Sequence, residues 1–498
     1  MQSLHRKDFG QLAQKLNRRP YIEPSRTVSS SYRTRSRSYR QSPAQPVSLP
    51  SHMKYPTHSQ IIEPTDLRVG MFIHLEGGWL AHPFPLSSFK LISEAQIATV
   101  QALGLAVRWY PEKGDAMTSG ALELDDVDGV ECVSSEPTLT NIDAQSLESS
   151  QSRARRLSRY VLATQRDSQA VCERQFNEAT QACRALTDLV CGQPGQAREQ
   201  AERLTQSLSA KMLGEDELCI RLLSENAGDK ASAHAMNVTV VSMLMGRSFG
   251  FNEADMQDLG VGAMLHDIGK LDLPERMRNR EDHFSRSEAS FYEEHVAFGI
   301  SQGKKMGLSP GALAIIAQHH ECADGSGFPA QLNTDRTTVS ARIVALVNRY
   351  DNLCNPNVTV RAVTPHEAVS LLFAQAKNKF DTAILSCFIK MMGVYPPGST
   401  VQLTNDRYGL VVSVNASRPL KPRVLVHEPG VPREEAQVVD LEQVTGLGIR
   451  RSIKPLALPP ESLGYLAPKA RTAYFFGAAD AVAPSVDQAL PSTQKAMA

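Results

Sequence analysis

The chain has 498 residues, a length that predicts two or three domains, and its 53 Lys and Arg residues balance its 53 Asp and Glu residues. A formal net charge of zero gives the whole chain no electrostatic attraction to nucleic acid or to a membrane surface, so we expect neither as a partner. The chain contains no run of eighteen apolar residues, so no transmembrane helix is predicted. Its eight cysteines include no Cys-x-x-Cys pair, which predicts free thiols in a cytoplasmic protein.

The first 143 residues predict one small domain between two irregular segments. Residues 1–60 carry several arginines among serines and tyrosines, with few acids and no apolar periodicity, which predicts a disordered basic arm without a secretion signal. Residues 61–112 have strand-like content near 67–75 and 106–110 and helical spacing over 92–103, which predicts a small α+β domain. Residues 113–143 are acidic and irregular and are interpreted as a linker.

A helical connector is predicted over residues 144–225. This segment is rich in Ala, Gln, Arg and Leu, and its main break is the run Gly-Gln-Pro-Gly at 192–195. Two long helices joined at that break are the simplest interpretation. They would pack onto the following domain or pair two protomers, so a homodimer stays open.

Six of the thirteen histidines gather within residues 234–320. Two of them open distinctive pairs, His266-Asp267 and His319-His320. Neutral imidazoles with a carboxylate suit metals such as Fe, Mn, Ni or Zn. A carboxylate such as Asp267 can bridge two ions, and paired ions hold the attacking and leaving oxygens of a phosphoryl displacement. The pattern therefore predicts metal-assisted hydrolysis of a phosphoester.

Both pairs are predicted to lie at the ends of helices. Apolar residues at three and four spacing precede each pair, at 259–265 and at 312–316. Residues 321–329 then form a run of turn residues, and a helix end that leads into a glycine-rich loop is typical of a pocket mouth.

These motifs resemble the signature of the HD-GYP family, which are bacterial phosphodiesterases that act on cyclic di-GMP. His-Asp-Ile-Gly-Lys occupies 266–270, and His-His-Glu-Cys-Ala-Asp-Gly-Ser-Gly-Phe-Pro occupies 319–329. The resemblance covers roughly residues 230–400 and implies an HD-type helical catalytic domain, which we assign to residues 226–398. Residues 62–110 look like the small N-terminal domain that often precedes it.

The resemblance also implies roles for individual residues. Two divalent ions, Fe or Mn, would be bound by seven side chains, with Asp267 and Lys270 as the catalytic pair. The implied metal ligands are His234, His266, Asp267, His295, His319, His320 and Asn348. The implied contacts to cyclic di-GMP are Lys270, Asp324, Gly327, Phe328 and Arg361.

The chain departs from the family pattern at four places. Phe328 stands where the family usually has Tyr, and Asn348 where it has an Asp ligand, with Asp351 one helical turn away as a candidate substitute. Lys230 replaces a Glu found in some members, which favours two metals over three. The run Asn-Val-Thr-Val at 357–360 replaces an Arg-Pro-Tyr-Lys phosphate clamp, leaving only Arg361 nearby.

The remaining segments complete a multi-domain, mainly α chain. Residues 399–478 contain short alternating strands and predict a small β appendage, and residues 479–498 predict a disordered tail.

Three functions stay open. The first is a metal-dependent phosphodiesterase that converts cyclic di-GMP to linear pGpG and/or GMP and so tunes motility and biofilm formation, as the resemblance implies. The second is a weak or inactive domain that binds nucleotides or proteins, among them the GGDEF diguanylate cyclases that make cyclic di-GMP. The third is hydrolysis of a different phosphoester.

Overall fold

The computed structural model describes residues 59–76, 88–111, 142–213, 218–223, 229–278, 284–356, 361–415, 421–436 and 438–478. The predicted tail, almost all of the predicted arm and linker, and residues 357–360 lie outside these ranges. So does His283, the one histidine of the 234–320 group that is not a candidate ligand. The described residues divide into two compact units, one within residues 1–116 and one that holds the rest of the chain.

The first unit is a small antiparallel sheet with one helix. The strand order is β1-β4-β2-β3. Ser93 caps the helix by accepting a hydrogen bond from Gln96, and Gly104 ends it in the left-handed conformation. The prediction of a small α+β domain is confirmed. Its elements are β1 (Gln60–Ile62), η1 (Pro64–Asp66), β2 (Phe72–Leu75), β3 (Ser88–Lys90), α2 (Glu94–Leu103) and β4 (Val107–Trp109).

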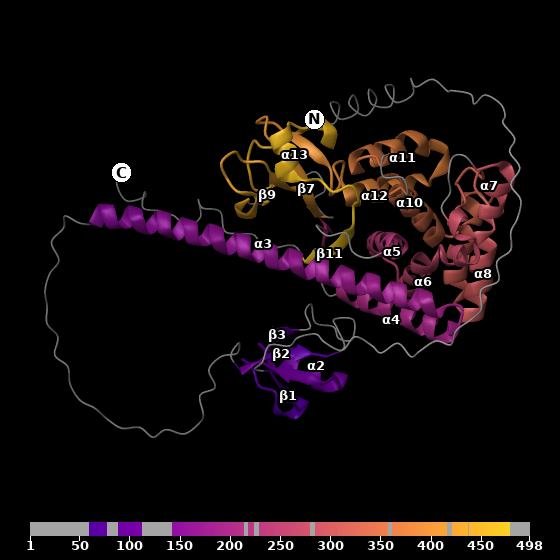
Figure 1. The fold of residues 1–498 in the computed structure, drawn as a ribbon, viewed down its shortest axis with the longest axis horizontal. Coiled ribbons are helices and arrows are strands. Elements are labelled where there is room, and N and C mark those ends of the chain that lie inside the picture. Colours follow the sequence, from indigo (N-terminus) through magenta and orange to yellow (C-terminus); the bar gives the residue numbers. More distant parts are fainter. Residues whose placement is uncertain are drawn as a thin grey trace, which may run out of the picture. The chain divides into compact units, whose positions relative to one another are not determined.

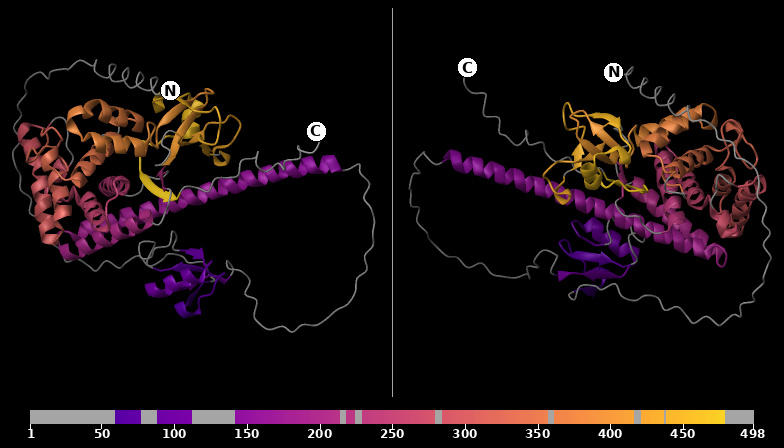
Figure 2. Two further views of the ribbon diagram at one scale, coloured as in Figure 1. Left: turned by 180° about the vertical axis from the view of Figure 1, so that it is seen from behind. Right: turned by 45° about the horizontal axis from the view of Figure 1, so that its top comes forward.

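The second unit opens with two long helices. They are α3 (Ile142–Leu189) and α4 (Pro194–Leu213), and the break between them is the predicted Gly-Gln-Pro-Gly run. Figures 1 and 2 both show α3 as one long straight helix that runs alongside α4 and past α5 and β11 (the strand Tyr474–Ala478). The two-helix prediction is confirmed.

The end of the predicted helical connector is a strand instead. Leu218–Leu222 forms β5, which lies between β7 and β11 in the larger sheet and is buried at all five positions. Strands buried on both faces read as continuous apolar runs, and five residues are too few for periodicity to separate helix from strand. The helical prediction over 218–222 was therefore wrong.

The larger sheet joins the segment before the histidine motifs to the segments after them. Its main path is β10-β6-β7-β5-β11, all pairs are antiparallel, and β8 joins β7 to β9. The C-terminal strands predicted from the sequence are confirmed, with β5 added to them. The strands are β6 (Thr400–Leu403), β7 (Tyr408–Asn415), β8 (Arg423–Val426), β9 (Val438–Asp440), β10 (Ile449–Ser452) and β11.

Five helices of the second unit position the histidine motifs. They pack through one core that also includes side chains of α3, α4 and β11. These five are α5 (Lys230–Ser248), α6 (Glu253–Leu265), α8 (His295–Met306), α9 (Pro310–Gln318) and α10 (Val339–Cys354). The other helices of the unit are η4 (Ile268–Asp272), η5 (Glu275–Met277), α7 (Arg286–Glu293), η6 (Thr334–Arg336), α11 (Pro365–Lys379), α12 (Thr382–Met392), η8 (Arg433–Glu435), η9 (Pro455–Ala457) and α13 (Pro460–Leu466).

None of the helices within the described ranges has both the length and the apolar character of a membrane span.

Candidate metal centre

Three of the histidines are oriented by the helix that ends just before each of them. His266, His295 and His319 each direct Nδ1 at the carbonyl oxygen three residues earlier, at 2.7, 2.6 and 2.8 Å. A carbonyl oxygen only accepts hydrogen bonds, so Nδ1 of each ring carries the proton and the lone pair lies on Nε2. This fixed tautomer is the arrangement in which an imidazole binds a metal through Nε2.

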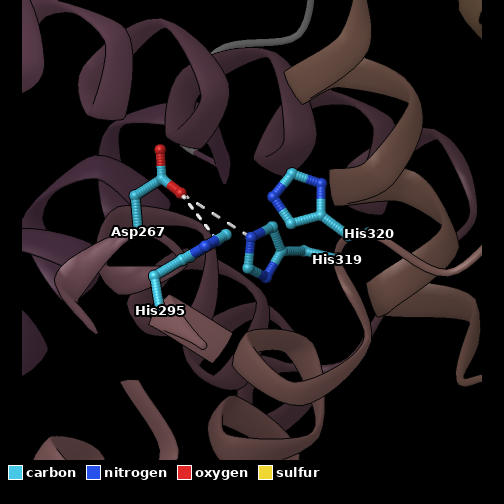
Figure 3. Close-up of side chains that lie close together, drawn as sticks. All are labelled: Asp267, His295, His319 and His320. Atoms are coloured by element: carbon cyan, nitrogen blue, oxygen red, sulfur yellow. Dashed lines mark ion pairs between the residues drawn. The ribbon is translucent and has the colours of Figure 1, made fainter. Parts of the chain in front are cut away.

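The Nε2 atoms of these rings point toward one carboxylate. Asp267 follows His266, the C-cap residue of α6. Its Oδ2 lies 3.4 Å from His266 Nε2, while its Oδ1 lies 3.7 Å from Nε2 of both His295 and His319. Figure 3 shows Asp267, His295, His319 and His320 facing a common space. Helices α6, α8 and α9 thus bring together residues more than fifty positions apart.

Five polar atoms in this space are buried without a hydrogen-bond partner among the described residues. A buried acceptor without a partner costs about 1–3 kcal/mol, so five in one place indicate a site built for a cation. The donor set, nitrogen with one carboxylate, fits a first-row divalent metal. The atoms are Nε2 of His266, His295, His319 and His320 and Oδ1 of Asp267.

The ligand atoms form two groups that share Asp267. One group is Asp267 with His295, His319 and His320, and the other is Asp267 with His234 and His266. Within each group the candidate ligand atoms lie within 4.8 Å of one another. A shared carboxylate between two nitrogen clusters is the arrangement expected of a bridged metal pair.

Burial and charge keep these groups in the protonation states that metal binding requires. Burial lowers the pKa of His266, lowers that of His295 to about 4, and holds that of His320 well below its usual value, so all three rings are neutral at pH 7. Burial alone would raise the pKa of Asp267, but Lys270, 2.6 Å away, and His266 outweigh it and hold that pKa well below its usual value. Asp267 is therefore ionised.

His234 is oriented differently, by an aspartate on α10. Its Nδ1 lies 2.6 Å from Asp351 Oδ2, and the other oxygen of Asp351 accepts hydrogen bonds from the amides of Asn237 and Asn355 at 2.8 and 2.9 Å. Asp351 is 2% exposed. Its carboxylate is thus engaged in holding His234, not placed as a substitute for the Asp ligand that Asn348 replaces.

Hydrogen bonds to the start of β11 and to the residues just before it hold the network around Asp351 in place. Asn237 donates to Thr472 O at 3.0 Å and accepts from the backbone N–H of Tyr474 at 3.0 Å, and Asn355 donates to Thr472 O at 2.8 Å. Our reading of the sequence missed Asn237, Asn355 and Thr472. The local sequence shows only that Asn237 is a polar residue within an apolar stretch of α5. Its partners cannot be identified from that stretch, because they lie more than a hundred residues away.

Replacing Asp351 by Asn removes the charge that holds His234. We expect metal affinity to fall by about 10–100-fold, because partners that orient a ligating histidine contribute on that scale. Metal titration of the purified variant measures this, with Asp335→Asn as a matched control, since Asp335 is exposed. Equal affinity in both variants would show that Asp351 does not position a ligand.

The glycine-rich loop is anchored beneath the second histidine pair. Glu321 is 5% exposed, and its carboxylate accepts from the backbone N–H groups of Ala330 and Leu332 at 2.8 and 2.9 Å. Phe328 stacks on His320 with ring centroids 4.4 Å apart and precedes a cis bond to Pro329. The Phe in place of Tyr therefore keeps a ring against the candidate ligand.

Glycine is required at Gly327 because the backbone of the histidine motif passes so close to it. A Cβ there would lie 2.5 Å from both Cys322 N and Glu321 Cα. No real Cβ approaches backbone atoms so closely, so this glycine lets the loop pack directly against the chain that follows His319 and His320.

Of the predicted substrate residues, Lys270 lies at the metal centre, whereas Asp324 and Arg361 are exposed. Lys270 is ion-paired to Asp267 and lies 5.5 Å from the centroid of the Tyr292 ring. Asp324 is exposed and accepts from the backbone N–H of Ser326 at 2.9 Å, which closes a local turn. Arg361 is exposed and directly follows residues 357–360. Their contacts with substrate stay predictions.

Asn348 is buried on α10, the helix that carries Asp351. Its Oδ1 accepts a hydrogen bond from Asn352 Nδ2 at 2.6 Å. A carbonyl oxygen has a second lone pair, so this bond does not exclude metal binding. Its role as a ligand stays a prediction.

Comparison with known proteins agrees with this geometry. The sequence profile of the HD domain matches residues 216–384, which include all the candidate ligands. A second profile, a domain of unknown function named DUF3391, matches residues 59–201. The cyclic di-GMP phosphodiesterase PA4108 of Pseudomonas aeruginosa is 26% identical over 398 residues, which are 76% of this chain and 88% of that protein. Residues 216–384 are thus similar to an HD domain.

Other relatives match this chain over a shorter length. The cyclic di-GMP phosphodiesterase response regulator RpfG of Xanthomonas campestris pv. campestris is 27% identical over 216 residues, 40% of this chain and 57% of that protein. Among solved structures, Bd1817, a HDG"Y"P protein from Bdellovibrio bacteriovorus, covers 66% of this chain and 97% of its own at 15% identity, with a TM-score of 0.35.

Proposed function

We propose that this protein is a metal-dependent phosphodiesterase that opens cyclic di-GMP to linear pGpG and/or GMP. The observation that carries the proposal is the buried set of four unpaired imidazole nitrogens around the ionised Asp267. The relative that spans most of this chain is named a cyclic di-GMP phosphodiesterase, which supports the same substrate.

The residues of the centre suit this chemistry. Two divalent ions bound there would polarise a phosphoryl oxygen and lower the pKa of water toward neutrality. His266, His295, His319 and His320 would present Nε2 as ligands, and Asp267 would contribute to both positions. The cationic Lys270 would neutralise charge that develops on the phosphoryl oxygens.

The alternative, a nucleotide- or protein-binding module without catalysis, fits the ligand set less well. A module that binds no metal has no use for a cluster of buried, unpaired nitrogens, and each unpaired atom would destabilise its fold. A module that holds the metals and binds a nucleotide without turnover is separated from an enzyme by the assay below. A GGDEF partner and a homodimer remain compatible with either function.

A substrate panel tests the proposal. Protein purified without oxygen and reloaded with Fe or Mn would be assayed with cyclic di-GMP, with a mixed cyclic dinucleotide and with a simple aryl phosphodiester. We expect the highest kcat/KM for cyclic di-GMP. Saturable binding of cyclic di-GMP by metal-loaded protein without any product would favour the binding module, and a preference for the mixed dinucleotide would change the assigned substrate.

The Asn at position 348, where the HD-GYP family has an Asp ligand, can be tested by substitution. Replacing it with Asp restores a negative ligand, and we expect metal affinity to rise on the order of tenfold, because charge count tunes affinity at oxygen ligands. Metal titration measures this, with Asn405→Asp as the control, because Asn405 is an exposed Asn in the turn between β6 and β7. An equal rise in Asn405→Asp would show a general effect of added negative charge and not a ligand at position 348.

A further inference from the structure

A second cavity lies in the larger unit, outside the metal centre. It has a volume of about 340 Å³ and lies between α3 on one side and strands β5, β7 and β8 on the other. Figures 1 and 2 show α3 running past this sheet. None of the residues that line it is a candidate metal ligand or belongs to the glycine-rich loop. Its size is within the range of small-molecule sites, roughly 300–1,000 Å³.

The cavity is lined by an excess of positive charge. Only one acidic residue, Glu173, is among its lining residues, and Asp440 outside it pairs with Arg423 at 3.2 Å. Gln169 donates to Glu173 at 2.9 Å, which holds that carboxylate against α3. The cations that line the cavity are Arg166, Arg221, Arg423, Arg433 and Lys469. They come from four separate stretches of chain, so folding itself gathers them.

Burial strengthens the interaction of these cations with a bound anion. Arg221 is 5% exposed and lies on β5, and the side chain of Arg423 on β8 is 15% exposed. Charged groups at partly buried positions interact more strongly with a ligand than exposed ones, because water screens them less. Guanidinium groups also match phosphate oxygens in a planar, two-pronged geometry and stack on flat rings.

The rest of the cavity lining consists mainly of aliphatic side chains, with a few neutral polar ones. Leu162 of α3, Leu222 of β5 and Leu425 of β8 supply apolar surface, and Ser413 adds a hydroxyl group. The amide of Gln165 also lines the cavity and pairs with the backbone of Val438 at 3.4 Å. A small inorganic anion would leave this apolar surface without a partner. A ligand with a phosphate at one end and a flat, partly apolar ring at the other would use both parts of the lining.

We propose that this cavity is a second, non-catalytic site that binds a nucleotide through its phosphate. The phosphate lies among the arginines from α3, β5, β8 and η8, and the base lies against the leucines. The site is independent of the metal centre, so it does not depend on the proposed hydrolysis.

Equilibrium dialysis tests the site directly. The full chain carrying Asp267→Ala, which disables the proposed metal centre, would be dialysed against labelled GMP, AMP, pGpG and cyclic di-GMP. We expect saturable binding of at least one of these nucleotides with one site per chain. Absence of saturable binding for all four overturns the proposal.

Three variants in the Asp267→Ala background locate the binding. Arg166→Glu/Arg433→Glu reverses two exposed cations, and Ala170→Trp fills the cavity without changing its charge. We expect each to weaken binding at least tenfold, while Arg174→Glu, an exposed control on α3 outside the cavity, binds like the parent. All the altered positions are exposed, and circular dichroism checks that the fold is kept.

Two results would contradict the assignment. Binding that both cavity variants leave unchanged would place the nucleotide elsewhere on the chain. Inorganic phosphate that competes as strongly as the nucleotides would show an anion site without base recognition.

Discussion

Replacing Asp267 by Ala is expected to remove both metals and to lower cyclic di-GMP turnover by about 1,000-fold or more, because the reaction depends on the bound ions. Asp267 is the one side chain that belongs to both candidate ligand groups. Its loss therefore disables both positions, and it also leaves Lys270 without its partner at 2.6 Å.

Single-histidine variants make this prediction specific. His320 belongs only to the group with His295 and His319, and His234 only to the group with His266. We expect about two metal ions per chain in the wild type, about one in His320→Ala and in His234→Ala, and almost none in Asp267→Ala. Metal analysis after gel filtration measures these values. One ion retained in Asp267→Ala would show that the aspartate does not bridge two sites.

Replacing Gly269 by Ala is expected to give the largest loss of stability. A Cβ at Gly269 would lie 2.9 Å from Gly299 Cα and closer still to His295 O and Gly299 N, all backbone atoms of α8. Backbone cannot move aside as a flexible side chain can, so η4 and α8 would have to separate. We expect a cost above about 3 kcal/mol and a lower metal content, because α8 carries His295.

A matched glycine serves as the control for this change. Gly464 lies in α13, and a Cβ there would meet nothing within 4 Å. Gly464→Ala should change stability by no more than about 1 kcal/mol, in the stabilising direction, because Ala favours helices over Gly. Urea unfolding of both variants makes the comparison. Equal stability of the two would mean that η4 does not pack against α8 as described.

The sequence predicted the gathering of the histidines because their motifs are local. A His-Asp pair and a His-His pair at helix ends, each followed by glycine, can be read without knowing the fold. The reason for Gly269 and Gly327 could not be read in this way. Gly269 in η4 lies against the backbone of α8, about thirty residues further along the chain. Gly327 lies against the backbone of residues 320–322, to which the glycine-rich loop folds back.

The support for His234 could not be predicted either. Asp351, Asn237 and the strand β11 meet only in the folded chain, and Asn237 is 235 residues from the carbonyl of Thr472. The same limit explains β5, whose strand character depends on neighbours in β7 and β11 that lie about two hundred residues or more beyond it. Local patterns report periodicity and caps, whereas these features depend on long-range pairing.

Turnover of cyclic di-GMP by the metal-loaded wild type, before and after chelation, tests the central claim most directly. Mass spectrometry would follow the conversion of the cyclic substrate to linear pGpG or GMP. We predict a linear product that disappears when a chelator removes the metal and returns when Mn or Fe is restored. Intact cyclic di-GMP in the presence of protein that demonstrably holds two metal ions would contradict the account.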